Sequence, residues 1–169
     1  TINSGGTYNA TSGTTTITSY TGARAIKVLE TDGTGFIHNN GLVKITDSGT
    51  RTGNIGGAGG SPSFNIITFY DLQLQGGDKE NRDCEVVVDN NFTIDSGSRL
   101  TSENSGDTIT VHGLTNNAGT FDGNDTTVIH NGLVTNTGTY HTSSGTYHFN
   151  GGVRQLGTFS SNDTLTIGG

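Results

Sequence analysis

A repeat of 19 residues in the C-terminal third of the chain constrains the fold more than any other feature. Its anchor is a Gly-Thr-aromatic tripeptide, which begins at Gly119, Gly138 and Gly157. Three β-strands of about four residues, joined by three turns, need roughly this length, so the period matches one coil of a β-solenoid. The repeat therefore predicts an all-β chain, a β-solenoid or β-helix with rungs of about 19 residues.

Apolar and polar residues alternate between the anchors, as they do in half-buried strands. In a solenoid, equivalent residues of successive coils stack in columns while the backbones pair. Two inward columns are expected: Ile109, Val128, Tyr147 and Leu165 in one, and Val111, His130, Phe149 and Ile167 in the other. We therefore expect His130 to face the core and the neighbouring His148 to face outward.

The composition agrees with a thin core and excludes several classes of protein. Thr, Gly, Asn and Ser make up 89 of the 169 residues, and all four are poor helix formers. No apolar run approaches 18 residues, so we expect no membrane insertion. The net charge of −7 repels phosphate, so we expect no nucleic acid partner.

An antiparallel fold is the alternative that the sequence leaves open. Asn-Gly between apolar segments is a strong hairpin signal. It occurs at Asn40, Asn131 and Asn150, each followed by Gly. Hairpins at these points would give an antiparallel β-sandwich or a trimeric β-fibre. The fixed period of 19 favours the solenoid, because hairpin sheets tolerate variable spacing.

The chain divides into four segments by composition. Residues 1–53 carry loose N-terminal β-repeats, and residues 54–63 form a Gly-rich loop or linker. Residues 64–111 form a central β segment, in which residues 78–85 are so highly charged that we expect an exposed loop. Residues 112–169 hold the 19-residue repeats. The amino-acid sequence at both chain ends resembles the repeats, so we expect the chain to be a piece of a longer protein.

No combination of residues points to catalysis, a metal or a cofactor. The histidines do not fall in one column, as a metal site would need. The acidic pairs Asp122 with Asp125 and Glu103 with Asp107 lie in turn-rich segments, whereas glycan cleavage needs carboxylates that converge. Cys84 is the only cysteine and is expected to be an inert thiol. We therefore predict a protein that is not an enzyme and holds no cofactor.

The most apolar stretch is the candidate oligomer contact, since it exceeds what one thin rung can bury. Its members are Phe64, Ile66, Phe69, Tyr70, Leu72 and Leu74. The alternative is that these residues are ordinary core.

The amino-acid sequences of the repeats resemble those of a known class of protein. Residues 1–19, with residues 36–41, 69–72 and 114–121, resemble the Thr/Gly/Asn-rich β-repeat text of large structural proteins of marine tailed bacteriophages. The repeat sequence is also similar to that of bacterial secreted β-helix adhesins. The resemblance implies a virion fibre or appendage that contacts the host surface, and it carries over no catalytic residues.

These observations predict a non-enzymatic structural protein, located in a virion or outside the cell. We expect it to form homo-oligomers and to contact other virion or filament subunits, with a cell-surface glycan as a further candidate partner. A subunit of a bacterial extracellular filament or surface adhesin is the alternative function. A polysaccharide-degrading tailspike is a third.

Overall fold

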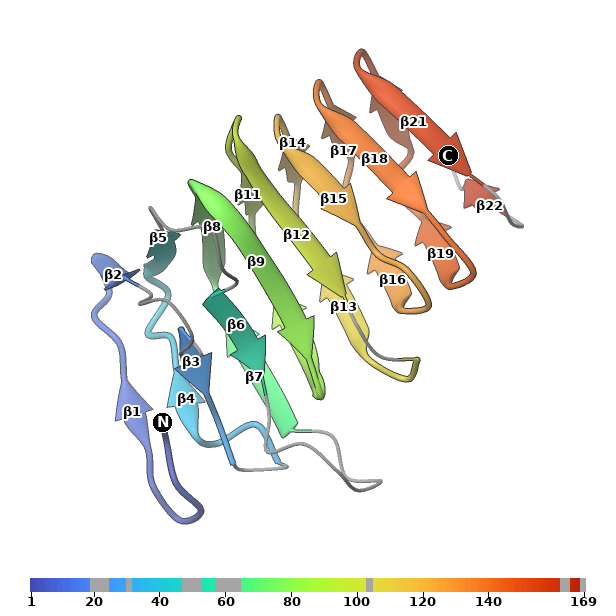
Figure 1. Cartoon of the computed structure of the whole chain (residues 1–169). Coiled ribbons are helices and arrows are strands. Elements are labelled where there is room, and N and C mark those ends of the chain that lie inside the picture. Colours follow the sequence, from blue (N-terminus) through green and yellow to red (C-terminus); the bar gives the residue numbers. More distant parts are fainter. Residues whose placement is uncertain are drawn as a thin grey trace.

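The chain forms a β-solenoid in which the strands of each sheet run parallel to one another (Figure 1). The structure is a computed structural model and describes residues 1–18, 25–29, 32–46, 53–56, 65–102, 105–161 and 165–167. Within these residues there is no helix, and every strand pairing is parallel. The predicted all-β solenoid is therefore confirmed.

Successive strands enter three sheets in turn, so each sheet takes every third strand. The first sheet contains β7 (Asn65–Phe69), β10 (Cys84–Val88), β13 (Thr108–Val111), β16 (Thr127–His130), β19 (Thr146–Phe149) and β22 (Leu165–Ile167). The second contains β2 (Thr14–Thr18), β5 (Leu42–Thr46), β8 (Asp71–Gln75), β11 (Phe92–Ile94), β14 (Thr115–Asn117), β17 (Val134–Asn136) and β20 (Val153–Gln155). The third contains β3 (Ile26–Lys27), β6 (Gly53–Gly56), β9 (Gly77–Arg82), β12 (Ser98–Ser102), β15 (Thr120–Asp122), β18 (Thr139–Thr142) and β21 (Thr158–Ser161).

A short fourth sheet continues the first sheet toward the N-terminus. It pairs β1 (Tyr8–Asn9) with β4 (Phe36–Ile37). The ring of Phe36 lies 5.4 Å from that of Phe69 in β7 and 5.8 Å from that of Tyr8. The three-sided coil is therefore maintained from the first strand to the last.

The predicted register is confirmed by the strand pairings. Ile109 pairs with Val128, Val128 with Tyr147, and Tyr147 with Leu165. The coils contain more residues toward the N-terminus, where Leu42 pairs with Asp71. The 19-residue period therefore describes the C-terminal coils, while the N-terminal coils hold up to ten residues more.

The antiparallel alternative is wrong, and the three Asn-Gly pairs do not form hairpins. Each lies at a corner between two strands of different sheets, as Asn131 does between β16 and β17. At these corners glycine is needed for space. A Cβ atom on Gly132 would lie 2.1 Å from the carbonyl oxygen of Gly113 in the coil below.

The same steric constraint explains the glycine of the Gly-Thr-aromatic anchor. A Cβ atom on Gly138 would lie 2.0 Å from the carbonyl oxygen of Gly119, and one on Gly157 would lie 2.1 Å from that of Gly138. Backbone stacks directly on backbone at this corner, so a side chain there would push two coils apart.

The aromatic residue of each anchor forms a stack along the core. Phe121, Tyr140 and Phe159 belong to one column, with ring centroids 4.5 and 5.4 Å apart and nearly parallel planes. Offset stacking of this kind stabilises each pair by about 1 kcal/mol beyond area burial. A chain with only 28% hydrophobic residues can thus still hold a continuous core.

Side-chain amides also stack inside the solenoid. Asn117 and Asn136 are buried on β14 and β17 and pair in register. Asn117 Nδ2 donates to Asn136 Oδ1 at 2.8 Å, and Asn136 Nδ2 donates to Gln155 Oε1 at 3.0 Å. Each amide NH2 group therefore meets an oxygen acceptor one coil away, which offsets the cost of burying it, whereas Asn117 Oδ1 is buried without a hydrogen-bond partner among the described residues.

Residues 78–85 do not form the exposed loop that their charge predicts. Seven of the eight contribute to strands β9 and β10, and Lys79, Asn81 and Cys84 are fully buried. The ammonium of Lys79 donates to the backbone carbonyls of Gln75, Gly76 and Gly77 at one corner. A buried charge is tolerated here because corner carbonyls surround it. Residues 54–56, the first part of the predicted Gly-rich loop 54–63, belong to strand β6 (Gly53–Gly56), while residues 57–63 lie outside the described residues.

Replacing the corner glycine tests this packing. We expect Gly138→Ala to lower the free energy of unfolding by about 2 kcal/mol, because the new methyl group overlaps a backbone carbonyl that cannot move away. Gly13→Ala is the matched control, since the nearest atom to its Cβ would be 3.6 Å away. Urea denaturation monitored by circular dichroism measures both. Equal stability of the two variants would contradict the steric role of Gly138.

Candidate functional site

The predicted oligomer contact is divided between the core and the surface. Phe69, Leu72 and Leu74 are at most 2% exposed and point into the solenoid. Ile66 and Tyr70 are half-buried on outward-facing positions, while Phe64 lies outside the described residues. Phe69, Leu72 and Leu74 are therefore ordinary core, the alternative left open for this stretch. Side chains with almost no exposed area cannot contact a second copy of the folded chain.

A charged substitution distinguishes these two roles. We expect Leu72→Asp to unfold the chain, since it buries a carboxylate without a partner, with a cost of about 4 kcal/mol or more. Thr93→Asp, on an outward-facing position of the adjacent strand β11, should leave the fold intact. Circular dichroism and size-exclusion chromatography report the outcome. A folded but dissociated Leu72→Asp variant would show that Leu72 is an oligomer contact instead.

His130 faces the core, as its column predicts, and is fully buried. Its Nδ1 lies 2.9 Å from Thr115 Oγ1 and its Nε2 lies 2.8 Å from the hydroxyl of Tyr140. Hydroxyl groups both donate and accept, so these two partners satisfy a neutral imidazole. Burial lowers the pKa of His130 to about 3 and raises the pKa of Tyr140 well above its ordinary value. Both groups are therefore neutral parts of the core and are not exposed for acid–base catalysis.

This environment makes the stability of the chain depend on pH. The unfolded chain binds a proton at His130 below pH 6.5, whereas the folded chain does not until about pH 3. His130 should therefore reduce stability as the pH falls through this range, by about 1.4 kcal/mol per pH unit. We expect His130→Gln to remove about one proton from the pH dependence of unfolding. His148→Gln, on the outer face, should leave the slope unchanged, and a similar loss in both variants would contradict this assignment.

The acidic residues do not converge on one site within the described part of the chain. Asp122 lies on the outer face of β15 and forms an ion pair with Arg99 at 2.7 Å. Asp125 contacts Ser144 at an exposed corner, and Asp107 is buried, where it accepts from the backbone N–H of Cys84. Glu103 lies outside the described residues. No group of three or more His, Cys, Asp or Glu residues in the described ranges is arranged to hold a metal ion.

Cys84 is inside the solenoid. Its thiol donates to Asn81 Oδ1 at 2.8 Å and lies 3.6 Å from the carbonyl oxygen of Ile55. A buried thiol of this kind is shielded from solvent oxidants and nucleophilic chemistry.

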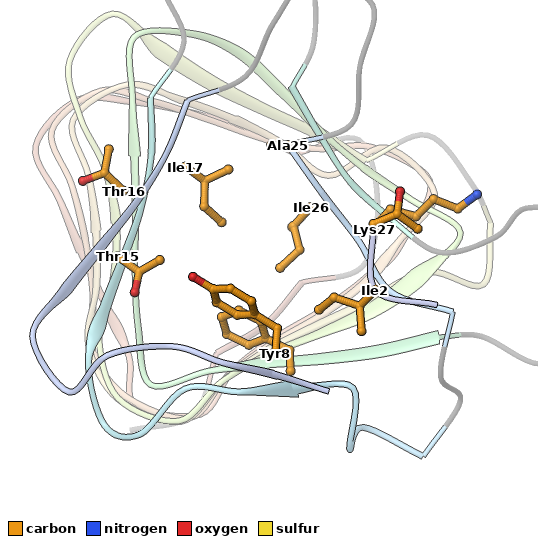
Figure 2. A pocket seen from close by; sticks show the side chains of 10 residues that line it. Ile2, Tyr8, Thr15, Thr16, Ile17, Ala25, Ile26 and Lys27 are labelled. Carbon is orange, nitrogen blue, oxygen red and sulfur yellow. The ribbon is translucent and has the colours of Figure 1, made fainter. Parts of the chain in front are cut away.

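The N-terminal end of the solenoid is hollow. A cavity of about 250 Å³ opens there between the first coil and the core beneath it (Figure 2). Ile2, Ile17, Ile26 and the ring of Tyr8 point into it, while Thr16 and Lys27 point away. The lining is therefore mainly apolar.

Both ends of the solenoid present strand edges. β2 and β3 end their sheets at the N-terminal side, and β20, β21 and β22 end theirs at the C-terminal side. Strand edges can pair with further strands, and the edge at β3 already does so, because the N–H of Ile2 donates to the carbonyl oxygen of Lys27 at 2.7 Å. Such edges are expected of any stack of coils, so they follow from the solenoid that the repeat predicts and not from the apolar stretch.

No family model, curated protein or solved structure matches the chain. In the described residues no helix has the length and hydropathy required to cross a bilayer.

Proposed function

We propose that this chain is a non-enzymatic structural segment of a fibre or appendage in the virion of a tailed phage. The observation that carries the proposal is the stacking of parallel coils along one axis, in three sheets of six or seven strands. A sheet of seven strands spaced about 4.8 Å apart is roughly 30 Å long, so the coils form a short rod.

The rod is suited to bearing load. Its three sheets share one core, and bending in any direction would stretch backbone hydrogen bonds in at least one of them. In the C-terminal coils the interior contains stacked rings and stacked amides. A rigid spacer needs no more than this, and the exposed faces remain free to contact neighbouring subunits or a host-surface glycan.

The repeat sequence resembles that of marine phage structural proteins, and this resemblance supports a location in the virion over a location in a cellular filament or adhesin. The acidic net charge and the abundance of Thr, Asn and Gly are compatible with a solvated surface along the whole rod.

Immunogold electron microscopy of the native source, with antibody to this chain, tests the proposal. We expect label at regular positions on phage tails or capsids, which would also identify the appendage. Label along filaments that emerge from cells would contradict the virion assignment and make the chain a filament or adhesin subunit. Antibody absorbed with the purified chain is the control.

A further inference from the structure

We infer that Asn131 is a site of self-modification, at which the side-chain amide becomes a carboxylate with help from His112 and Asn150. Asn131 is followed by Gly132 at the corner between β16 and β17, and the structure describes the corners of the coils on both sides. The inference goes beyond the proposed structural function and does not depend on it.

An asparagine followed by glycine can lose its amide group through a cyclic imide. The backbone nitrogen of the glycine gives its proton to water and attacks Cγ of the asparagine, while the electron pair of the carbonyl moves to Oδ1. The carbonyl forms again as the bond from Cγ to Nδ2 breaks, and Nδ2 takes up a proton and leaves as ammonia. Water then opens the imide to aspartate or isoaspartate, so water is the only co-reactant.

The attacking nitrogen is available at this corner. Among the described residues no group accepts from the N–H of Gly132, whereas the N–H of Gly41, in the other Asn-Gly-Leu sequence, donates to the carbonyl oxygen of His38 at 3.0 Å. A larger residue cannot replace Gly132, because its Cβ atom would lie 2.1 Å from the carbonyl oxygen of Gly113. The packing of the corner therefore requires the residue that shields this nitrogen least.

Two side chains contact the atoms whose charge changes in the reaction. Asn150 Nδ2 donates to Asn131 Oδ1 at 2.8 Å, where it stabilises the negative charge that forms on this oxygen. His112 Nδ1 lies 3.0 Å from Asn131 Nδ2, the nitrogen that leaves, and an imidazole at this distance can pass a proton to it. Asn131 and His112 are exposed, so water can reach the imide and return the proton to the imidazole.

The aspartate product also fits the corner. A carboxylate at residue 131 would still accept from Asn150 Nδ2, and it would face the imidazole of His112. The same pairing of carboxylate and imidazole occurs nearer the N-terminus, where Asp89 lies 3.3 Å from Nε2 of His38. The reaction therefore adds a negative charge at an exposed corner and should leave the fold intact.

Asn40 is the matched internal control. It shares the sequence Asn-Gly-Leu with Asn131, but among the described residues no group forms a hydrogen bond with its side-chain amide. The folded chain is incubated in mildly alkaline water labelled with oxygen-18, and mass spectrometry of its peptides gives the rate at each asparagine. We expect Asn131 to react about tenfold faster than Asn40 in the folded chain, and at a similar rate in denaturant.

Variants of the two assisting side chains test the mechanism. His112→Gln keeps an acceptor for the amide but cannot supply a proton, so the rate at Asn131 should fall about fivefold while the rate at Asn40 stays the same. Asn150→Ala, which removes the donor to Oδ1, should also slow Asn131. His148→Gln makes the same change as the first variant on the outer face of β19 and should have no effect.

Two results would overturn the inference. One is equal rates at Asn131 and Asn40 in the folded chain, which would show that the corner gives no assistance. The other is a rate at Asn131 that His112→Gln leaves unchanged or raises, since a higher rate would mean that the hydrogen bond to His112 protects the amide. Circular dichroism of each variant shows that the rates belong to the folded chain.

Discussion

Backbone hydrogen bonding between successive coils, at a fixed register, is the constraint on which the rest of this structure depends. Once coils pair in parallel, each residue lies above its equivalent one coil away. Rings then meet rings, as in Phe121, Tyr140 and Phe159, and amides meet amides, as in Asn117 and Asn136. The corner glycines follow from the same geometry, because there the coils approach too closely for a Cβ atom.

The sequence predicts the fold best where this register is regular. The period of 19 correctly placed Val128 above Ile109 and directed His130 into the core. It could not show that residues 78–85 are strands, because a local excess of charge reads as solvated loop until the corner carbonyls that surround Lys79 are known. The Asn-Gly pairs suggested hairpins for a similar reason, because a hairpin turn and a solenoid corner both need glycine. The hairpin needs it for its backbone dihedral angles, and the corner needs it for space.

The sequence also contained the internal amide ladder, although composition obscured it. Asn117, Asn136 and Gln155 recur with the anchor, two residues before its glycine. An asparagine taken alone predicts a turn, and only the stacked partner makes its burial favourable. The strand edges at the ends follow from the predicted stacking of coils. The sequence left two roles open for Phe69 and Leu72, an oligomer contact or ordinary core, because composition does not show which side of a strand faces inward, and both residues are core.

The central claim is that the coils stack in parallel with a 19-residue register, and the nuclear Overhauser effect tests it most directly. In a uniformly labelled chain, we expect backbone cross peaks between Ile109 and Val128 and between Val128 and Tyr147. Cross peaks between Hα atoms of residues on either side of Asn131 and Gly132 would instead indicate an antiparallel hairpin. That result would contradict the solenoid, along with the functional proposals that depend on it.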